Sequence, residues 1–489
     1  MNSRVSSPSN LIPAFLCSRM PEALLIALLA GLDFACAHEA SHVQPLHSPE
    51  AQPLGLKTPA PVNPEIRDLP NVSASWFKPS GSAVRLYLLE VGPHSTTHPP
   101  LVLVHGAGSG GNRVFYPVLA ALSSKRHVIA VDLPGFGRSE RRGDDFAPDQ
   151  MVRQVASVVD ALGVGRFDVL GHSSGGPLAL LFAAQSPKLV RRLVLVDPVG
   201  VLRPETLLRG QLHGQLSDMR GSSPLAAGIV EKSGDALVSF VALFVGSSGG
   251  ISDAGLAGSS PTALLAMALL DYNFGAALFG IRAPTLLVWG DRDDVAPVRI
   301  AQVLEDRIPD SKLSFLKDSG HNPMRDQPAA LVELVTSYLD DPKEERAGQN
   351  APKKPAQNTR CKHQDDVTIT GDYGEINLDH CKRARLNRVR ARRIVVREST
   401  VHIEHGYVTE GVIANSSDLV ITGGELRGKV ALDLNGGTHD IAGADIEGKV
   451  AAIRARAKTT VLFSVTRIKS PKATRILHEA MDLAPRQEL

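Results

Sequence analysis

Ser173 lies in a short motif, Gly171-His-Ser-Ser-Gly175, that could present a nucleophile. The motif follows an apolar run, Phe167 to Leu170, and precedes a helical pattern, Pro177 to Gln185, which together indicate a strand, a sharp turn and a helix. Glycines flank such a turn because a side chain at either position would collide with the neighbouring backbone. A serine in an ordinary tight turn is the structural alternative, but this setting favours an exposed hydroxyl that attacks a substrate.

A serine hydroxyl needs a base, and two later motifs supply a base and an acid. Gly290-Asp-Arg-Asp293 and Ser319-Gly-His-Asn-Pro323 each come after a short apolar run. His321 would take the proton of Ser173 and later deliver it to the leaving group, while Asp293 would orient the imidazole and stabilise its cation. The spacing therefore predicts Ser173, Asp293 and His321 as nucleophile, acid and base.

A glycine-rich turn, His105-Gly-Ala-Gly108, follows another apolar run and could supply hydrogen-bond donors. We predict that the backbone N–H groups of Ala107 and Ser174 form an oxyanion hole for the carbonyl oxygen of a substrate. A phosphate-binding glycine loop is the alternative, and the sequence contains no Walker pattern to support it.

The elements that must position these motifs are short aliphatic runs that alternate with helical patterns. Such runs are typical of strands buried on both faces, and their alternation with helices predicts an α/β fold with a mostly parallel sheet. Ligands of such sheets gather at the carboxyl ends of the strands, where every motif above lies. The runs are Val84 to Val91, Leu101 to Val104, Val128 to Val131, Phe167 to Leu170, Leu193 to Val196, Thr285 to Trp289 and Lys312 to Phe315.

Residues 75–340 resemble the α/β-hydrolase superfamily in these motifs and in the loop Asp132-Leu-Pro-Gly-Phe-Gly-Arg-Ser139. The resemblance implies a hydrolase domain over 71–340 whose cap, or lid, covers about 199–283. It implies that Asp293 is the acid, with Asp197 as the alternative, since some members place the acid after an earlier strand. Relatives that act on epoxides or haloalkanes carry aspartate where this chain has Ser173.

By the same resemblance the chain is an esterase-like hydrolase of a small-molecule or lipid-like ester, with no cofactor. Acyl transfer and carbon–carbon bond cleavage could use the same three residues. A catalytically silent binding protein is the alternative from another class, because a fold alone does not prove chemistry.

The N-terminal 37 residues have the features of a signal peptide. Arg4 and Arg19 precede or flank an apolar run, Ala23 to Leu32, and Ala35-Cys-Ala37 fits a cleavage site. The run is too short to cross a bilayer, which needs about 20 residues. We therefore expect export to the periplasm, the cell surface or the medium, with a linker over 38–70.

A charged and proline-bearing linker over 341–360 precedes a region of short alternating runs, 361–475. Leu426 to Leu432 recurs 20 residues later as Ile446 to Ala452, a period that predicts a solenoid of the right-handed parallel β-helix type with about five coils. Cys361 and Cys381 have the same spacing, so they would lie on adjacent coils and form a disulfide. Two free thiols are the alternative.

The whole chain has a net charge of only +2, but basic residues are dense near Arg383–Arg397. Their alternation along a strand favours a solvated outer face, and the functional alternative is an anionic polysaccharide or a membrane surface. Nucleic acid is not expected, because no aromatic residues are interleaved with the basic ones. The histidines and cysteines after residue 360 have no metal-ligand spacing, so no metal is predicted.

Overall fold

The computed structural model describes residues 55–80, 82–141, 146–203, 260–341 and 357–489. All of them belong to one compact unit, His42–Leu489. The predicted signal peptide, 1–37, and residues 204–259 of the predicted cap lie outside the described residues. Among the helices that are described, none is long and apolar enough to cross a membrane.

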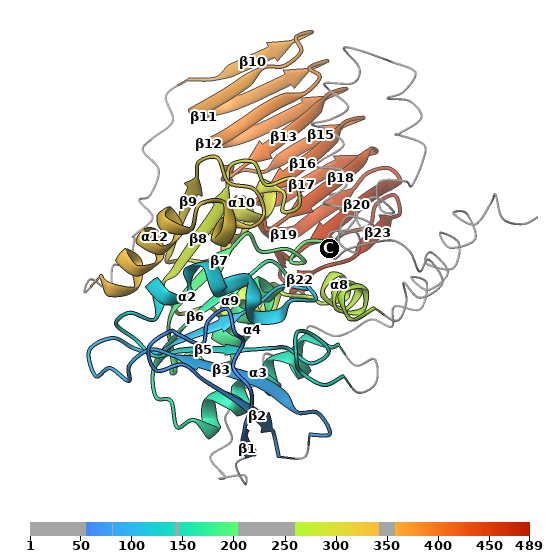
Figure 1. Ribbon diagram of the computed structural model, residues 1–489. Helices are drawn as coiled ribbons and strands as arrows, with labels where there is room; N and C mark the ends of the chain where they lie inside the picture. The colour runs from blue at the N-terminus through green and yellow to red at the C-terminus, as the bar shows by residue number, and fades with distance from the viewer. Residues whose placement is uncertain (1–54, 81, 142–145, 204–259, 342–356) are drawn as a thin grey trace, which may run out of the picture. The chain divides into compact units, whose positions relative to one another are not determined.

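The first part of the chain forms a nine-stranded sheet in the order β1-β2-β3-β5-β4-β6-β7-β8-β9 (Figure 1). Strands β5, β4, β6, β7, β8 and β9 are parallel, whereas β1, β2 and β3 join as antiparallel neighbours. The bounds are β1 Leu56–Pro59, β2 Ser73–Lys78, β3 Leu86–Val91, β4 Leu101–Val104, β5 Val128–Val131, β6 Phe167–His172, β7 Val190–Val196, β8 Thr285–Gly290 and β9 Ser311–Leu316. This is the mostly parallel α/β sheet that the aliphatic runs predict.

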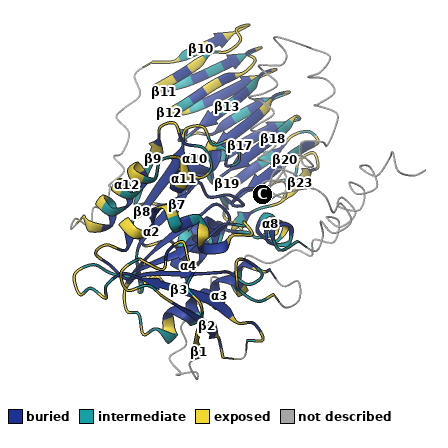
Figure 2. Cartoon of the chain, viewed as in Figure 1, coloured by how far each residue is buried: buried dark blue, intermediate teal, exposed yellow. Residues whose placement is uncertain are grey.

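Helices cover both faces of this sheet, whose central strands are buried (Figure 2). The strands alternate their side chains between two apolar cores. In β3, Leu86 and Leu88 enter one core while Tyr87 and Leu89 enter the other. Helices α3, α4, α9 and α10 contribute to the first core, and α2 and α12 to the second. The bounds are η1 Gly111–Phe115, α2 Tyr116–Leu122, α3 Pro148–Ala161, α4 Gly175–Gln185, α8 Pro261–Asp271, α9 Gly275–Gly280, α10 Val298–Arg307, α11 Pro323–Asp326 and α12 Pro328–Asp340.

The fold begins earlier than the sequence suggests. Residues 56–70, interpreted above as part of a linker, contain β1, which pairs with β2 from Leu56↔Lys78 to Pro59↔Ser75. The four residues of β1 are all exposed, so this strand has no apolar alternation from which it could be recognised. The segment 261–278, expected as part of the cap, forms α8 and α9.

The second part of the chain is all strand, and its consecutive coils stack in parallel register, which confirms the predicted β-solenoid character (Figure 1). The strands are β10 Thr359–Lys362, β11 Thr368–Asp379, β12 Ala384–Arg397, β13 Thr400–Glu404, β14 Tyr407–Val408, β15 Val412–Asn415, β16 Asp418–Thr422, β17 Glu425–Asn435, β18 Thr438–Ala442, β19 Asp445–Ala455, β20 Thr459–Ser464 and β21 Thr466–Lys469. Two further strands, β22 Thr474–Leu477 and β23 Ala480–Leu483, pair antiparallel with β21 and β20 and end the stack.

The coil length is not a constant 20 residues. Leu426 pairs with Ile446, as the repeat predicts, but in the first coil Cys361 pairs with Leu378, an offset of 378 minus 361, or 17. Cys361 and Cys381 are therefore not directly opposed, and they form a disulfide with Cα atoms 6.4 Å apart. The coils differ in length partly because the register shifts inside the paired strands, between Ile369 and Gly371 and between Gly428 and Val430.

Helix α10 of the hydrolase part contacts the solenoid through a buried arginine. Arg299 donates to both carboxyl oxygens of Asp440 at 2.8 and 3.3 Å and to the hydroxyl of Thr422 at 2.9 Å. Arg299 is 6% exposed, so its charge depends on these partners. The solenoid is thus part of the support of the helix that follows Asp293.

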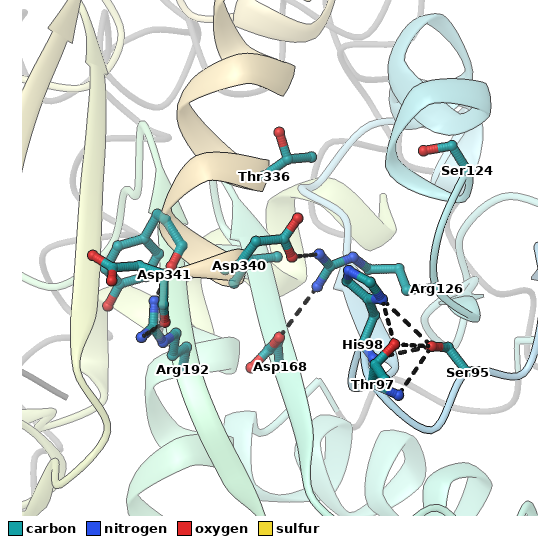
Figure 3. A network of polar contacts seen from close by, with 12 residues as sticks. Ser95, Thr97, His98, Ser124, Arg126, Asp168, Arg192, Thr336, Asp340 and Asp341 are labelled. Atoms are coloured by element: carbon teal, nitrogen blue, oxygen red, sulfur yellow. Dashed lines mark hydrogen bonds and ion pairs between the residues drawn. The ribbon is translucent and has the colours of Figure 1, made fainter. Parts of the chain in front are cut away.

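A buried ion-pair network lies at the amino ends of the strands, away from the predicted site (Figure 3). The Arg126 guanidinium approaches Asp168 of β6 at 3.6 Å and pairs with Asp340 of α12. Arg191 donates twice to Asp168, at 2.9 and 2.6 Å. Arg126 and Asp168 are almost fully buried, so their charges have lost their hydration and depend on their ion-pair partners.

Candidate active site

The turn between β6 and α4 holds Ser173 in a conformation that few residues adopt. Its φ is +54°, in the left-handed region, and its side chain reaches the surface of a cleft. A Cβ added at Gly171 would lie 2.4 Å from the carbonyl oxygen of Gly175, and one at Gly175 would lie 2.3 Å from that of Val104. Close backbone contacts therefore require glycine at both positions.

Ser173, His321 and Asp293 come together as a hydrogen-bonded series. The Ser173 Oγ lies 2.9 Å from His321 Nε2, and His321 Nδ1 lies 2.8 Å from Asp293 Oδ2. The side chain of Asp293 is 0% exposed and that of His321 is 17% exposed. In this arrangement Nδ1–H donates to the carboxylate, which leaves Nε2 as the acceptor for the serine hydroxyl proton.

Asp293 is kept ionised by several donors. Its Oδ1 accepts hydrogen bonds from the backbone N–H groups of Val295 and Ala296, at 2.8 and 2.9 Å. Burial would raise the pKa of Asp293, but the hydrogen bond from His321 and these two backbone donors hold it below its ordinary value. His321 bonds to Asp293, whereas Asp197, the alternative acid, accepts from the Gly290 N–H and makes no hydrogen bond to His321.

His172, the variable residue of the glycine–serine motif, supports the backbone of His321. Its Nε2–H donates to the carbonyl oxygen of His321 at 2.8 Å. Burial, followed by the nearby His321, lowers the pKa of His172 to about 3, so its ring is neutral. The sequence motif gave no sign of this role, because any residue satisfies its second position.

The peptide that carries the Ala107 N–H is fixed on its opposite side. The carbonyl of Gly106, in that same peptide, accepts from His105 Nδ1 at 2.7 Å and from Gly108 N at 2.9 Å. His105 Nε2 accepts from Leu133 N at 2.9 Å, which sets the tautomer in which Nδ1 carries the proton. These hydrogen bonds fix the plane of the peptide and so fix the direction of the Ala107 N–H. The carbonyl oxygen of Ala107, in the next peptide, accepts from the Thr262 hydroxyl at 2.9 Å.

Ser174, predicted as the second donor, lies at the start of α4. It is the N-cap residue of that helix, where backbone N–H groups have no partner within the helix. The N-terminus of α4 also carries the positive end of the helix dipole, which favours negative charge near Ser173. The loop from Gly106 to Gly111 leads into the short helix η1 and not into a long one, an arrangement that does not suit a phosphate-binding loop.

A cleft of about 690 Å³ contains Ser173, His321 and the Gly106–Gly108 turn. Two of its walls come from segments that sequence reasoning did not connect with the site. Glu65 and Ile66 precede β2, and Arg113 lies in η1, where its guanidinium pairs with Glu65 at 2.5 Å. Only a three-dimensional structure reveals these residues, since neither segment carries a motif.

The loop from Asp132 to Ser139 braces the glycine turn without entering the chemistry. Asp132 accepts from the backbone N–H groups of Asn112 and Arg138, at 2.6 and 2.8 Å. A Cβ at Gly137 would lie 2.2 Å from the Asp132 carboxylate. The motif residues therefore tie two loops of the site together through one buried carboxylate.

The basic residues of β12 alternate with buried apolar ones, as a solvated outer face requires. Arg392 and Arg393 pair with Glu410, and Arg383, directly before β12, pairs with Asp366. Binding of an anionic polysaccharide or a membrane surface stays a prediction. Among the described residues no group of three or more histidine, cysteine or acidic side chains is arranged to hold a metal ion.

Comparison with known proteins identifies the class. Residues 99–328 match the alpha/beta hydrolase fold family. A 2-hydroxymuconate semialdehyde hydrolase of Pseudomonas sp. is 29% identical over 267 residues, covering 49% of this chain and 86% of that protein. A monoacylglycerol lipase of Xenopus laevis is 26% identical over 258 residues, covering 49% of this chain and 75% of that protein.

Among solved structures, a putative lipase from Acinetobacter baumannii has a TM-score of 0.41 and 24% identity, covering 55% of this chain and 91% of that one. The sheet, the elbow at Ser173 and the family match define one class of protein. Residues 99–328 of the chain belong to the alpha/beta hydrolase fold family, and the named relatives above are hydrolases.

Proposed function

We propose that the protein is a serine hydrolase that cleaves a carboxylic ester, or a related acyl bond, through an acyl-enzyme. The observation that carries the proposal is the continuous series Ser173 Oγ–His321 Nε2–His321 Nδ1–Asp293, with distances of 2.9 and 2.8 Å, inside a cleft. The two relatives named above are a semialdehyde hydrolase and a monoacylglycerol lipase, and these names support hydrolysis of an acyl or carbonyl substrate.

In the proposed reaction the Ser173 oxygen attacks the ester carbonyl carbon while His321 Nε2 takes the hydroxyl proton. The negative charge that forms on the carbonyl oxygen is stabilised by the N–H groups of Ala107 and Ser174, and Asp293 stabilises the imidazolium. The carbon–oxygen bond to the alcohol then breaks, and His321 returns the proton to the leaving alcohol. Water, deprotonated by His321, attacks the acyl-serine, releases the acid and restores Ser173.

The buried neutral His172 and the fixed Gly106 peptide support this assignment, because both hold reacting groups in place before a substrate binds. The nucleophile is serine, so the first attack falls on an acyl carbon of the substrate and not on the alkyl carbon that an aspartate nucleophile would attack. Carbon–carbon cleavage and acyl transfer use the same residues and are distinguished by the products.

The test is hydrolysis of p-nitrophenyl acetate, butyrate and laurate by the protein, by Ser173→Ala and by Ser124→Ala. Ser124 is an exposed serine whose hydroxyl donates to the nearby carbonyl of Ala121, so it is a matched control. We expect turnover, and labelling by a fluorophosphonate, in the wild type and the control, and loss of both in Ser173→Ala by about 10³-fold or more. A folded wild type that shows neither turnover nor labelling would favour the binding-protein alternative.

We also propose that the protein is exported, on the basis of the N-terminal charge, apolar run and Ala35-Cys-Ala37 pattern. Mass spectrometry of the protein from the extracytoplasmic fraction should find an N-terminus at His38. Recovery of the uncleaved chain from the cytoplasm alone would refute export.

A further inference from the structure

A second carboxyl group lies beside Asp293 and takes no part in the mechanism above. Asp197 follows β7, the strand that pairs with β8, so the ends of these two neighbouring strands bring Asp197 and Asp293 together. Asp197 is 0% exposed, and its side chain lies within hydrogen-bonding range of the Asp293 side chain.

One oxygen of Asp197 has a partner and the other does not. Oδ1 accepts from the backbone N–H of Gly290 at 2.9 Å. Oδ2 is fully buried and has no partner if both carboxyl groups are ionised, because two carboxylates can only accept. A buried carboxylate without a partner costs free energy, and a proton on Oδ2 would turn this acceptor into a donor.

The charges around Asp197 favour the protonated form. Asp293 faces it from the turn after β8, and Asp326 adds a further negative charge from α11, while the Gly290 N–H opposes them. Burial is the largest influence, and with Asp293 it raises the pKa of Asp197 well above its ordinary value. Asp293, by contrast, has the donors that keep it ionised.

We propose that Asp197 is a positioning residue, a neutral carboxylic acid whose Oδ2–H donates a hydrogen bond to the Asp293 carboxylate. Asp293 then receives donors from His321, from Val295 and Ala296, and from Asp197, which fixes its plane against the imidazole. The role rests on the proposed function, in which Asp293 supports His321. It differs from the role of an alternative acid, since Asp197 carries no charge and acts through Asp293.

Asparagine is the informative replacement at this position. Asp197 has a φ of +44°, and asparagine is among the few residues that tolerate this backbone conformation. Its amide oxygen can accept from the Gly290 N–H, and its amide N–H can donate to Asp293. Asp197→Asn therefore keeps the hydrogen bonds and the zero charge of a protonated aspartic acid, whereas an ionised Asp197 would have a negative charge and no donor. Asp197→Ala removes the donor.

Two measurements decide the proposal. The first is an infrared difference spectrum, wild type minus Asp197→Asn, at pH 7, in which we expect the carbonyl band of a protonated carboxylic acid. This band does not depend on turnover, so a protein that shows the band but hydrolyses no ester would refute the proposed function and leave the protonated Asp197 standing. Absence of the band would overturn the proposal.

The second measurement is the pH dependence of kcat/KM for p-nitrophenyl butyrate. For Asp197→Asn we expect kcat within about threefold of wild type and an unchanged acid limb, because no charge near His321 is removed. Asp197→Ala should lose about tenfold or more in kcat with little change in KM, as expected when an oriented hydrogen bond to a charged group is lost. An acid limb shifted to lower pH by one unit in Asp197→Asn would show that Asp197 was ionised, and would overturn the proposal.

Discussion

His172 makes the hydrolase part sensitive to acid. The ring is neutral and buried, and its pKa is about 3, against an ordinary value of 6.5 in the unfolded chain. Between these two values the unfolded chain binds a proton that the folded chain does not, so the free energy of unfolding falls as the pH falls. The slope is about 1.4 kcal/mol per pH unit for one such group.

The contribution of His172 can be isolated with His172→Gln. A glutamine amide can still donate to the His321 carbonyl but does not titrate, so the variant keeps the hydrogen bond and loses the pH dependence. From pH 7 to pH 5, His172 alone should lower the free energy of unfolding by about 2 kcal/mol. The wild type should therefore lose about 2 kcal/mol more than His172→Gln over this interval.

The assay is urea unfolding at pH 7 and pH 5, followed by tryptophan fluorescence. The chain has two tryptophans, Trp76 and Trp289, and both lie in the hydrolase part, so the signal reports on that part alone. Other titrating groups are shared by the two proteins and cancel in the difference between them. Equal losses in wild type and variant would refute the assignment of His172 as a buried neutral ring.

Two other predictions concern the glycine turn and the ion-pair network. Gly106→Ala should lower kcat for p-nitrophenyl butyrate by about 10²-fold, because the new Cβ would lie 2.7 Å from the Cβ of Ser173 and displace the peptide that carries the Ala107 donor. Gly108→Ala is the control and should change kcat little, because its Cβ would meet nothing within 4 Å. Equal kcat values for the two variants would contradict this reasoning. Asp168→Asn should lower the free energy of unfolding by about 3 kcal/mol or more, because it leaves the buried Arg126 with a weaker partner. Asp318→Asn, which breaks the exposed pair of Arg292 and Asp318, should lower it by less than about 1 kcal/mol. Urea unfolding measures both variants, and equal effects would argue against a buried network.

The strands of the hydrolase sheet could be predicted because burial on both faces imposes continuous aliphatic runs, as in Leu101–Val104 and Val128–Val131. The site motifs could be located because Ser173, Asp293 and His321 need a strand end and particular residue types beside them. In contrast, β1 is exposed along its length and has no pattern to detect.

Other parts of the site depend on contacts between distant segments. Glu65 lies on the cleft because β1 and β2 add to the sheet edge, and Thr262 reaches Ala107 across 155 positions of sequence. His172 occupies a position at which the motif allows any residue. The solenoid period was visible at Leu426 and Ile446, which pair 20 residues apart, and was misleading at Cys361, which pairs with Leu378 only 17 residues away.

The antiparallel strands β22 and β23 have a consequence for self-assembly. Coils of a solenoid present rows of backbone N–H and C=O groups, and a second copy could in principle extend the stack from an open end. At the C-terminal end these rows are already occupied by β22 and β23, which run against the direction of the coils. Fibre growth by head-to-tail coil stacking requires two complementary open ends. A second copy stacked on this end would therefore meet strands that run against the coils, and it could not continue the parallel register of the solenoid.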